Sequence, residues 1–126
     1  MNLYFLTAGI LTVLLGIIHS ILGEKLIFQR LSQADPIPSP WNKTLSGQRM
    51  RSIRSSWHLV SFFGWGIAAI LLRMSFPATA GEYVIFAKNT FVVTFFITAI
   101  YWFIGTRGKH PAWIILLLIG VLTWMA

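Results

Sequence analysis

Residues 3–22 contain no Asp, Glu, Lys or Arg. An apolar run of about 20 residues is the length of an α-helix that crosses the hydrocarbon core of a bilayer, roughly 30 Å thick. The backbone in lipid must satisfy its own hydrogen bonds, and the run lacks the alternation of an outer-membrane barrel strand. It therefore predicts an all-α membrane protein.

Three further apolar runs follow, at about residues 55–73, 83–104 and 110–125. Composition agrees, because 56% of the residues are hydrophobic and only 10% are charged, whereas soluble domains carry roughly 25% charged residues. The last run is short for a full crossing. The 126 residues thus predict one domain, a four-helix transmembrane bundle of antiparallel helices with an interfacial or cytoplasmic first loop.

Basic side chains gather between the first and second runs and between the third and fourth. They are Lys25, Arg30, Lys43, Arg49, Arg51 and Arg54 in the loop 24–54, and Arg107 and Lys109 in the later one. The positive-inside rule then predicts that both loops lie in the cytoplasm and both termini on the other side of the membrane. In a bacterium this would be an inner-membrane protein with both termini in the periplasm. Arg49, Arg51 and Arg54 are expected to contact lipid head groups. Nucleic acid is not an expected partner, because the basic residues that give the net charge of +7 lie between the apolar runs and do not form a face of their own.

The loop 24–54 is the longest polar part of the chain. Its start is expected to continue the first helix along the membrane surface. The three prolines between residues 35 and 40 predict a stiff turn that cannot be helical. The second helix can begin as early as Thr44, well before its apolar run.

The first run carries a regular seam of small residues. Gly9, Gly16 and Gly23 recur every seven residues, and Thr12 and His19 each lie three residues after a glycine. Small residues in this pattern let helices approach closely in lipid. The seam therefore predicts that His19 faces a neighbouring helix.

Polar residues concentrate at the depth of the cytoplasmic helix ends. The expected cluster comprises His19, Ser20, Glu24, Arg54, His58, Ser61, Thr98, Tyr101 and His110. Histidines on two helices, His19 and His58, can ligate a haem iron or a transition metal, and Glu24 would complete a two-histidine, one-carboxylate set. The same side chains can instead bond to one another and serve only to hold the helices together, or they can carry protons or a substrate.

These residues favour a non-enzymatic binding or accessory protein with a polar pocket on the cytoplasmic side. The chain has no cysteine, and Asp35 lies in the proline-rich turn, so no Cys nucleophile or Ser/His/Asp set is predicted. A small-molecule or proton-coupled transporter and a lipid-modifying membrane enzyme are the alternatives. Membrane lipids are expected partners, together with a second copy or another membrane subunit.

The stretch His19-Ser-Ile-Leu-Gly-Glu24, followed by basic residues and Trp57-His58, resembles an uncharacterised group of small bacterial membrane proteins. The resemblance covers mainly the first two runs. It implies a topology of four helices and no established activity.

Overall fold

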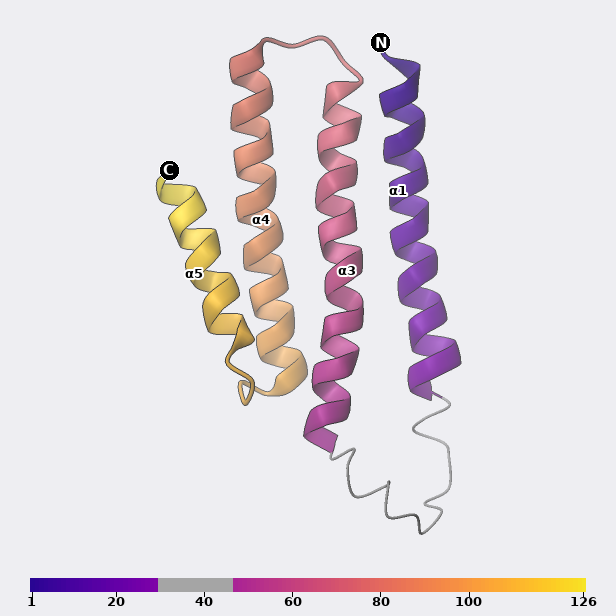
Figure 1. Ribbon diagram of the computed structural model, residues 1–126, viewed down its shortest axis with the longest axis vertical. Helices are drawn as coiled ribbons and strands as arrows, with labels where there is room; N and C mark the ends of the chain where they lie inside the picture. The colour runs from indigo at the N-terminus through magenta and orange to yellow at the C-terminus, as the bar shows by residue number, and fades with distance from the viewer. Residues whose placement is uncertain (30–46) are drawn as a thin grey trace.

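The computed structural model describes residues 1–29 and 47–126. Every regular element in these residues is helical (Figure 1). The elements are α1 (Leu3–Leu22), the π-helical segment η1 (Gly23–Phe28), α3 (Gly47–Met74), α4 (Ala80–Thr106) and α5 (Ala112–Met125). The all-α prediction is therefore confirmed. The proline-rich turn lies outside the described residues, as do Arg30, Lys43 and the helix start expected at Thr44.

Three helices are long and apolar enough to cross a membrane: Leu3–Phe28, Arg49–Met74 and Ala80–Thr106. The fourth apolar run forms α5, as predicted, but this helix has only 14 residues. At 1.5 Å per residue it is about 21 Å long, which is less than the hydrocarbon core of roughly 30 Å. Figure 1 shows its end beside the middle of α4. Length and composition thus support three crossings rather than four.

Local signals fix the helix ends. The Asn2 side chain accepts hydrogen bonds from the Tyr4 and Phe5 amides at the start of α1, at 3.0 and 3.3 Å. Thr79 and Glu82 form a reciprocal capping box at the start of α4, which satisfies amides that have no partner within the helix. α3 begins long before its apolar run, as the sequence suggested. Arg49, Arg51 and Arg54 therefore lie on a helix.

The helices are arranged in chain order, each antiparallel to the next (Figure 1). Among the described residues, extensive contacts between different helices join α1 with α3, α3 with α4, and α4 with α5. The predicted bundle is therefore open, because α1 and α5 do not close around a common core. Helices of this length and hydropathy suit lipid, where apolar faces gain little from packing against each other. Large aliphatic side chains such as Leu15, Ile85 and Ile115 accordingly stay exposed.

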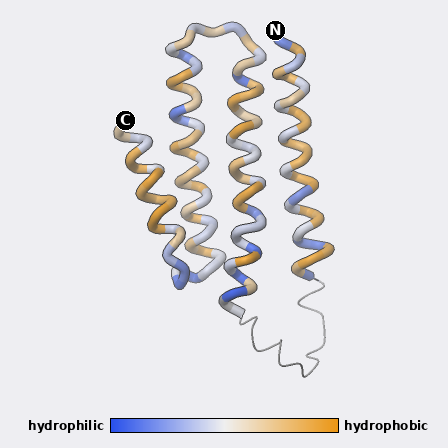
Figure 2. The backbone as a smooth tube through the Cα atoms, in the orientation of Figure 1, coloured by the Kyte–Doolittle hydropathy of each residue, from blue (hydrophilic) through white to orange (hydrophobic). Residues whose placement is uncertain are grey.

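Hydrophobic and hydrophilic residues are unevenly distributed along the helices. Figure 2 shows hydrophobic residues along the helices and hydrophilic ones at one end, around the start of α3 and the α4–α5 connection. This end, where the described basic residues Lys25, Arg49, Arg51, Arg54, Arg107 and Lys109 lie, is called the basic end below. It is also where the end of α1 meets the beginning of α3.

The glycine seam of α1 faces α3, as predicted. Large α3 side chains occupy the space beside the glycines: Leu72 at Gly9, Trp65 at Gly16 and Trp57 at Gly23. A Cβ added at Gly9 would lie 2.7 Å from Leu72 Cγ, and at the other two glycines it would collide with the indole rings. The seam thus holds large side chains of α3 in place of side chains of its own.

Candidate functional site

A chain of polar side chains links η1, α1 and α3 at the basic end. Ser20 Oγ donates to Ser61 Oγ at 2.8 Å and lies 3.1 Å from Nδ1 of His58. The other ring nitrogen of His58, Nε2, lies 3.5 Å from a Glu24 carboxylate oxygen. Glu24 also accepts two hydrogen bonds from Arg54, from Nε at 2.9 Å and from Nη2. These five residues, called the polar cluster below, come together as the sequence predicted.

The antiparallel contact between α1 and α3 explains why the cluster forms. Ser20 lies in the last turn of α1, on the side facing α3, where Ser61 is buried. Glu24 lies one turn further, in the π-helical segment rather than in α1 itself. π-helical turns are rare and frequently occur at functional sites. Because Glu24 meets Arg54 with both oxygens, the guanidinium is fixed in one orientation.

His19 has a different environment from His58. Its ring stacks on Trp57, with centroids 4.4 Å apart and an interplanar angle of 4°. The Trp57 indole N–H donates to the carbonyl oxygen of His19 at 3.0 Å. The prediction that His19 faces a neighbouring helix is confirmed. Its Nε2 is buried and has no hydrogen-bond partner among the described residues.

The two-histidine, one-carboxylate metal set is not assembled in the described residues. No group of three His, Asp or Glu side chains suited to a metal ion occurs in residues 1–29 and 47–126. The reason is that His19 is turned onto Trp57, whereas both ring nitrogens of His58 face Ser20 and Glu24. Haem ligation by the two histidines stays a prediction, and it would require His58 to give up one of these partners.

Tyr101 joins the site, but two other expected members do not. The Tyr101 ring lies edge-on to His58, with centroids 5.8 Å apart. Thr98 is fully buried and donates to the Thr94 carbonyl of its own helix at 2.6 Å. His110 accepts from the Ala112 amide at 3.2 Å, at the start of α5. Thr98 and His110 therefore serve local helix structure.

A pocket of about 240 Å³ opens beside the polar cluster, between α3 and α4. Its lining consists of Arg51, Arg54, Ser55, Tyr101, Ile104 and Gly105. Arg51, Arg54 and Ser55 share one face of α3, with His58 one turn further. Gly105 leaves room for Ser55, whose Oγ would lie 2.5 Å from a Cβ at that position. Sequence reasoning missed Ser55 and Gly105, although the spacing 51, 54, 55 and 58 was a signal for one helix face.

The chain was compared with known proteins at three levels. No family model matches it, and neither a curated protein nor a solved structure shows significant similarity. The resemblance to a group of small bacterial membrane proteins therefore stays a prediction. What the site can do must be argued from its own geometry.

Proposed function

We propose that this chain is a small integral membrane protein that binds the phosphate-bearing head group of an anionic lipid in the pocket between α3 and α4. Three helices of crossing length support a membrane location. The basic end favours the cytoplasmic face of a bacterial inner membrane by the positive-inside rule. The N-terminus then faces the periplasm, and the C-terminus joins it only where a thinned bilayer lets α5 cross.

The lining of the pocket carries the proposal. Two arginines, Arg51 and Arg54, line this pocket together with Tyr101, at the end of apolar helices. Guanidinium groups bind phosphate oxygens through paired, charge-assisted hydrogen bonds. The Tyr101 hydroxyl makes no hydrogen bond with a described residue, so it can donate to a ligand. Acyl chains of the same lipid would lie along the apolar faces of α3 and α4.

Glu24 and His58 act as positioning residues in this proposal. Glu24 engages Nε and Nη2 of Arg54, while a guanidinium carries five N–H donors in a fixed fork. The remaining donors of Arg54 therefore stay oriented for a ligand. His58 limits the movement of Glu24 from the other side. Replacing Glu24 would release the Arg54 fork without removing a ligand contact.

Binding is favoured over transport by where the polar cluster ends. The cluster stops at Ser61, about half of the way along α3. Further along the neighbouring helix, the Thr94 and Thr98 hydroxyls donate to carbonyls of their own helix. Hydroxyls engaged in this way offer no continuous path for protons or a polar substrate.

Binding is also favoured over catalysis. Ser20, His58 and Glu24 line up as hydroxyl, imidazole and carboxylate, the combination that serine hydrolases use. Such enzymes need hydrogen-bond donors that stabilise an oxyanion, commonly backbone N–H groups. Ser20 lies within the last turn of a helix that continues into η1, so the surrounding amides are engaged in helical hydrogen bonds. The alternative of a lipid-modifying enzyme is therefore disfavoured, because the described residues around Ser20 offer no oxyanion site.

Lipid-dependent thermal stability of the full chain in mild detergent tests the proposal. Phosphatidylglycerol should raise the melting temperature, whereas phosphatidylcholine should not. Arg51→Gln should weaken phosphatidylglycerol binding about tenfold, since one charge-assisted hydrogen bond contributes roughly 1.5 kcal/mol. Tyr101→Phe should weaken it less. Glycerol 3-phosphate should compete at high concentration if the head group is what the pocket recognises.

Lys109→Gln is the matched control, because Lys109 is a basic residue at the same end that does not line the pocket. Its affinity for phosphatidylglycerol should equal that of the wild type. Equal loss in Arg51→Gln and Lys109→Gln would reduce the effect to general surface charge. Equal stabilisation by both lipids would refute head-group recognition.

A further inference from the structure

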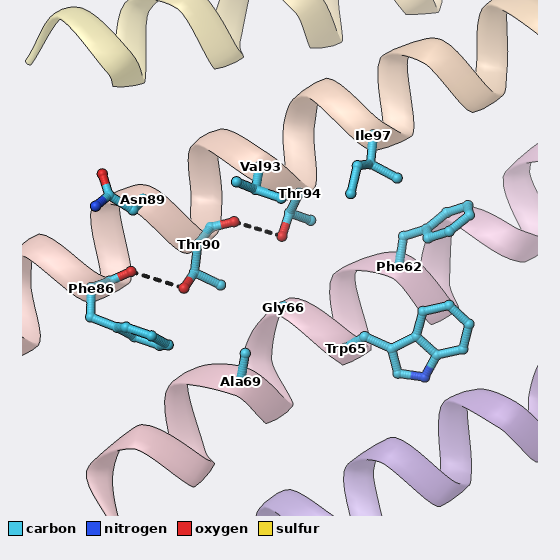
Figure 3. A pocket seen from close by; sticks show the side chains of 10 residues that line it. All are labelled: Phe62, Trp65, Gly66, Ala69, Phe86, Asn89, Thr90, Val93, Thr94 and Ile97. Atoms are coloured by element: carbon cyan, nitrogen blue, oxygen red, sulfur yellow. Dashed lines mark hydrogen bonds between the residues drawn. The ribbon is translucent and has the colours of Figure 1, made fainter.

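A larger pocket, of about 420 Å³, lies in the groove between α3 and α4 (Figure 3). From α3 it is lined by residues that include Trp65, Gly66 and Ala69, and from α4 by Asn89, Val93 and Ile97 among others. These residues recur at spacings of three and four, so they form one continuous face on each helix. Val93 is 55% exposed, and the groove is therefore open to the surroundings of the molecule.

Asn89 is the exception in this lining, because its exposed carboxamide makes no hydrogen bond with a described residue. The neighbouring Thr90 and Thr94 hydroxyls each donate to a carbonyl of α4 at 2.8 Å, as Figure 3 shows. Asn89 lies nine residues after Ala80, or about 13 Å along α4. In a chain that crosses the membrane, that depth lies within the hydrocarbon core. An unpaired amide there is costly, so a hydrogen-bonding partner would be stabilising.

We propose that two copies of the chain pair through this groove, with the two Asn89 carboxamides bonded to each other across a two-fold axis. A carboxamide carries both donors and an acceptor, so it is complementary to its own symmetry mate in an isologous interface. Asparagine side chains form such bonds between transmembrane helices, and small residues such as Gly66 and Ala69 permit close approach.

The rest of the fold agrees with this choice of face. The glycine seam of α1 would be the obvious alternative, but Trp57, Trp65 and Leu72 of the same chain already fill it. Facing grooves would surround the two-fold axis with α3 and α4 from each copy. The open layer would thereby become a closed four-helix bundle. The pairing does not depend on head-group binding at the basic end.

Disulfide cross-linking in membranes tests the pairing cleanly, because the chain has no cysteine of its own. Val93→Cys places one thiol in the groove. Phe91→Cys is the matched control, since Phe91 is 42% exposed at nearly the same depth and does not line the groove. Mild oxidation should give covalent dimers of Val93→Cys and none, or far fewer, of Phe91→Cys.

Asn89→Leu in the Val93→Cys background should lower the cross-linked fraction about threefold or more, because an interhelical hydrogen bond in lipid is worth roughly that factor. Equal cross-linking at both positions would indicate random collision and overturn the proposal. A monomeric Val93→Cys protein would also overturn it, whether the groove then holds a co-purified lipid or not. An unchanged fraction in Asn89→Leu would refute the asparagine pair.

Discussion

α3 packs against its two neighbours in different ways. Towards α1 it sends tryptophans into gaps left by glycines, and both indole N–H groups bond to carbonyls of α1, those of His19 and Val13. Towards α4 it presents small and aromatic residues. Gly66 lies against Thr94 and Ser55 against Gly105, and the rings of Phe62 and Phe63 pack edge-on against Tyr101 and Phe95. Pockets of about 240 and 420 Å³ remain along that second interface. The first interface is filled by the chain itself, whereas the second leaves space for other molecules.

The difference reflects what stabilises helix contacts in lipid. Apolar surface gains little there from leaving the solvent, so van der Waals packing and interhelical hydrogen bonds decide which contacts hold. The α1–α3 interface has both, through large side chains and their N–H donors. At the α3–α4 interface, the Thr94 and Thr98 hydroxyls donate to carbonyls of α4 itself and not to α3. We therefore expect α1 and α3 to form the firmer pair.

The largest effect should come from Gly16→Ala, because the added Cβ would collide with the Trp65 indole. Overpacking of this kind destabilises a protein by about 1–3 kcal/mol. The free energy of unfolding, measured by denaturant titration in detergent, should fall by about that amount. Gly64→Ala is the control on α3, since a Cβ at Gly64 meets nothing within 4 Å. Equal losses in the two variants would show that the seam is not tightly filled.

A smaller loss is expected from Trp65→Phe. The substitution keeps an aromatic ring beside Gly16 but removes the N–H that donates to the Val13 carbonyl at 3.3 Å. Interhelical hydrogen bonds in membrane proteins contribute on the order of 0.6 kcal/mol, and the unfolding free energy should fall by slightly more because the ring is smaller. Trp124→Phe is the control, because Trp124 is exposed. If Trp65→Phe matched this control, the indole hydrogen bond would contribute nothing.

The smallest effect should come from Thr98→Val, although Thr98 is completely buried. Its hydroxyl bonds to a carbonyl of its own helix, so no contact between helices is lost. Unfolding free energy should fall by about 0.5 kcal/mol, the low end of what one hydrogen bond contributes. A loss as large as that of Gly16→Ala would mean that the two interfaces of α3 do not differ as described.

Much of the fold and part of the site could be predicted from the sequence. The apolar runs located the four α-helices of the described residues, and the seven-residue glycine spacing identified the face of α1 that meets α3. The similar depth of Ser20, Glu24 and His58 along two antiparallel helices predicted that these residues lie close together. These inferences succeed because they depend on helix geometry, which is regular.

The rest depends on how the side chains are oriented and on which helix faces pack together. The metal set is not assembled in the described residues, because stacking on Trp57 and bonding to Ser20 turn His19 and His58 to different partners. Thr98 and His110 were misplaced because a local backbone partner was nearer than the cluster. The open arrangement could not be read from apolar runs, since lipid covers an exposed face as readily as a helix does.

The order of the helices has a consequence for biosynthesis. Each extensive contact between different helices in the described residues joins helices that follow one another along the chain. Each described α-helix after α1 thus meets a partner that has already left the ribosome. Assembly of this chain can therefore proceed one helix at a time, in step with translation.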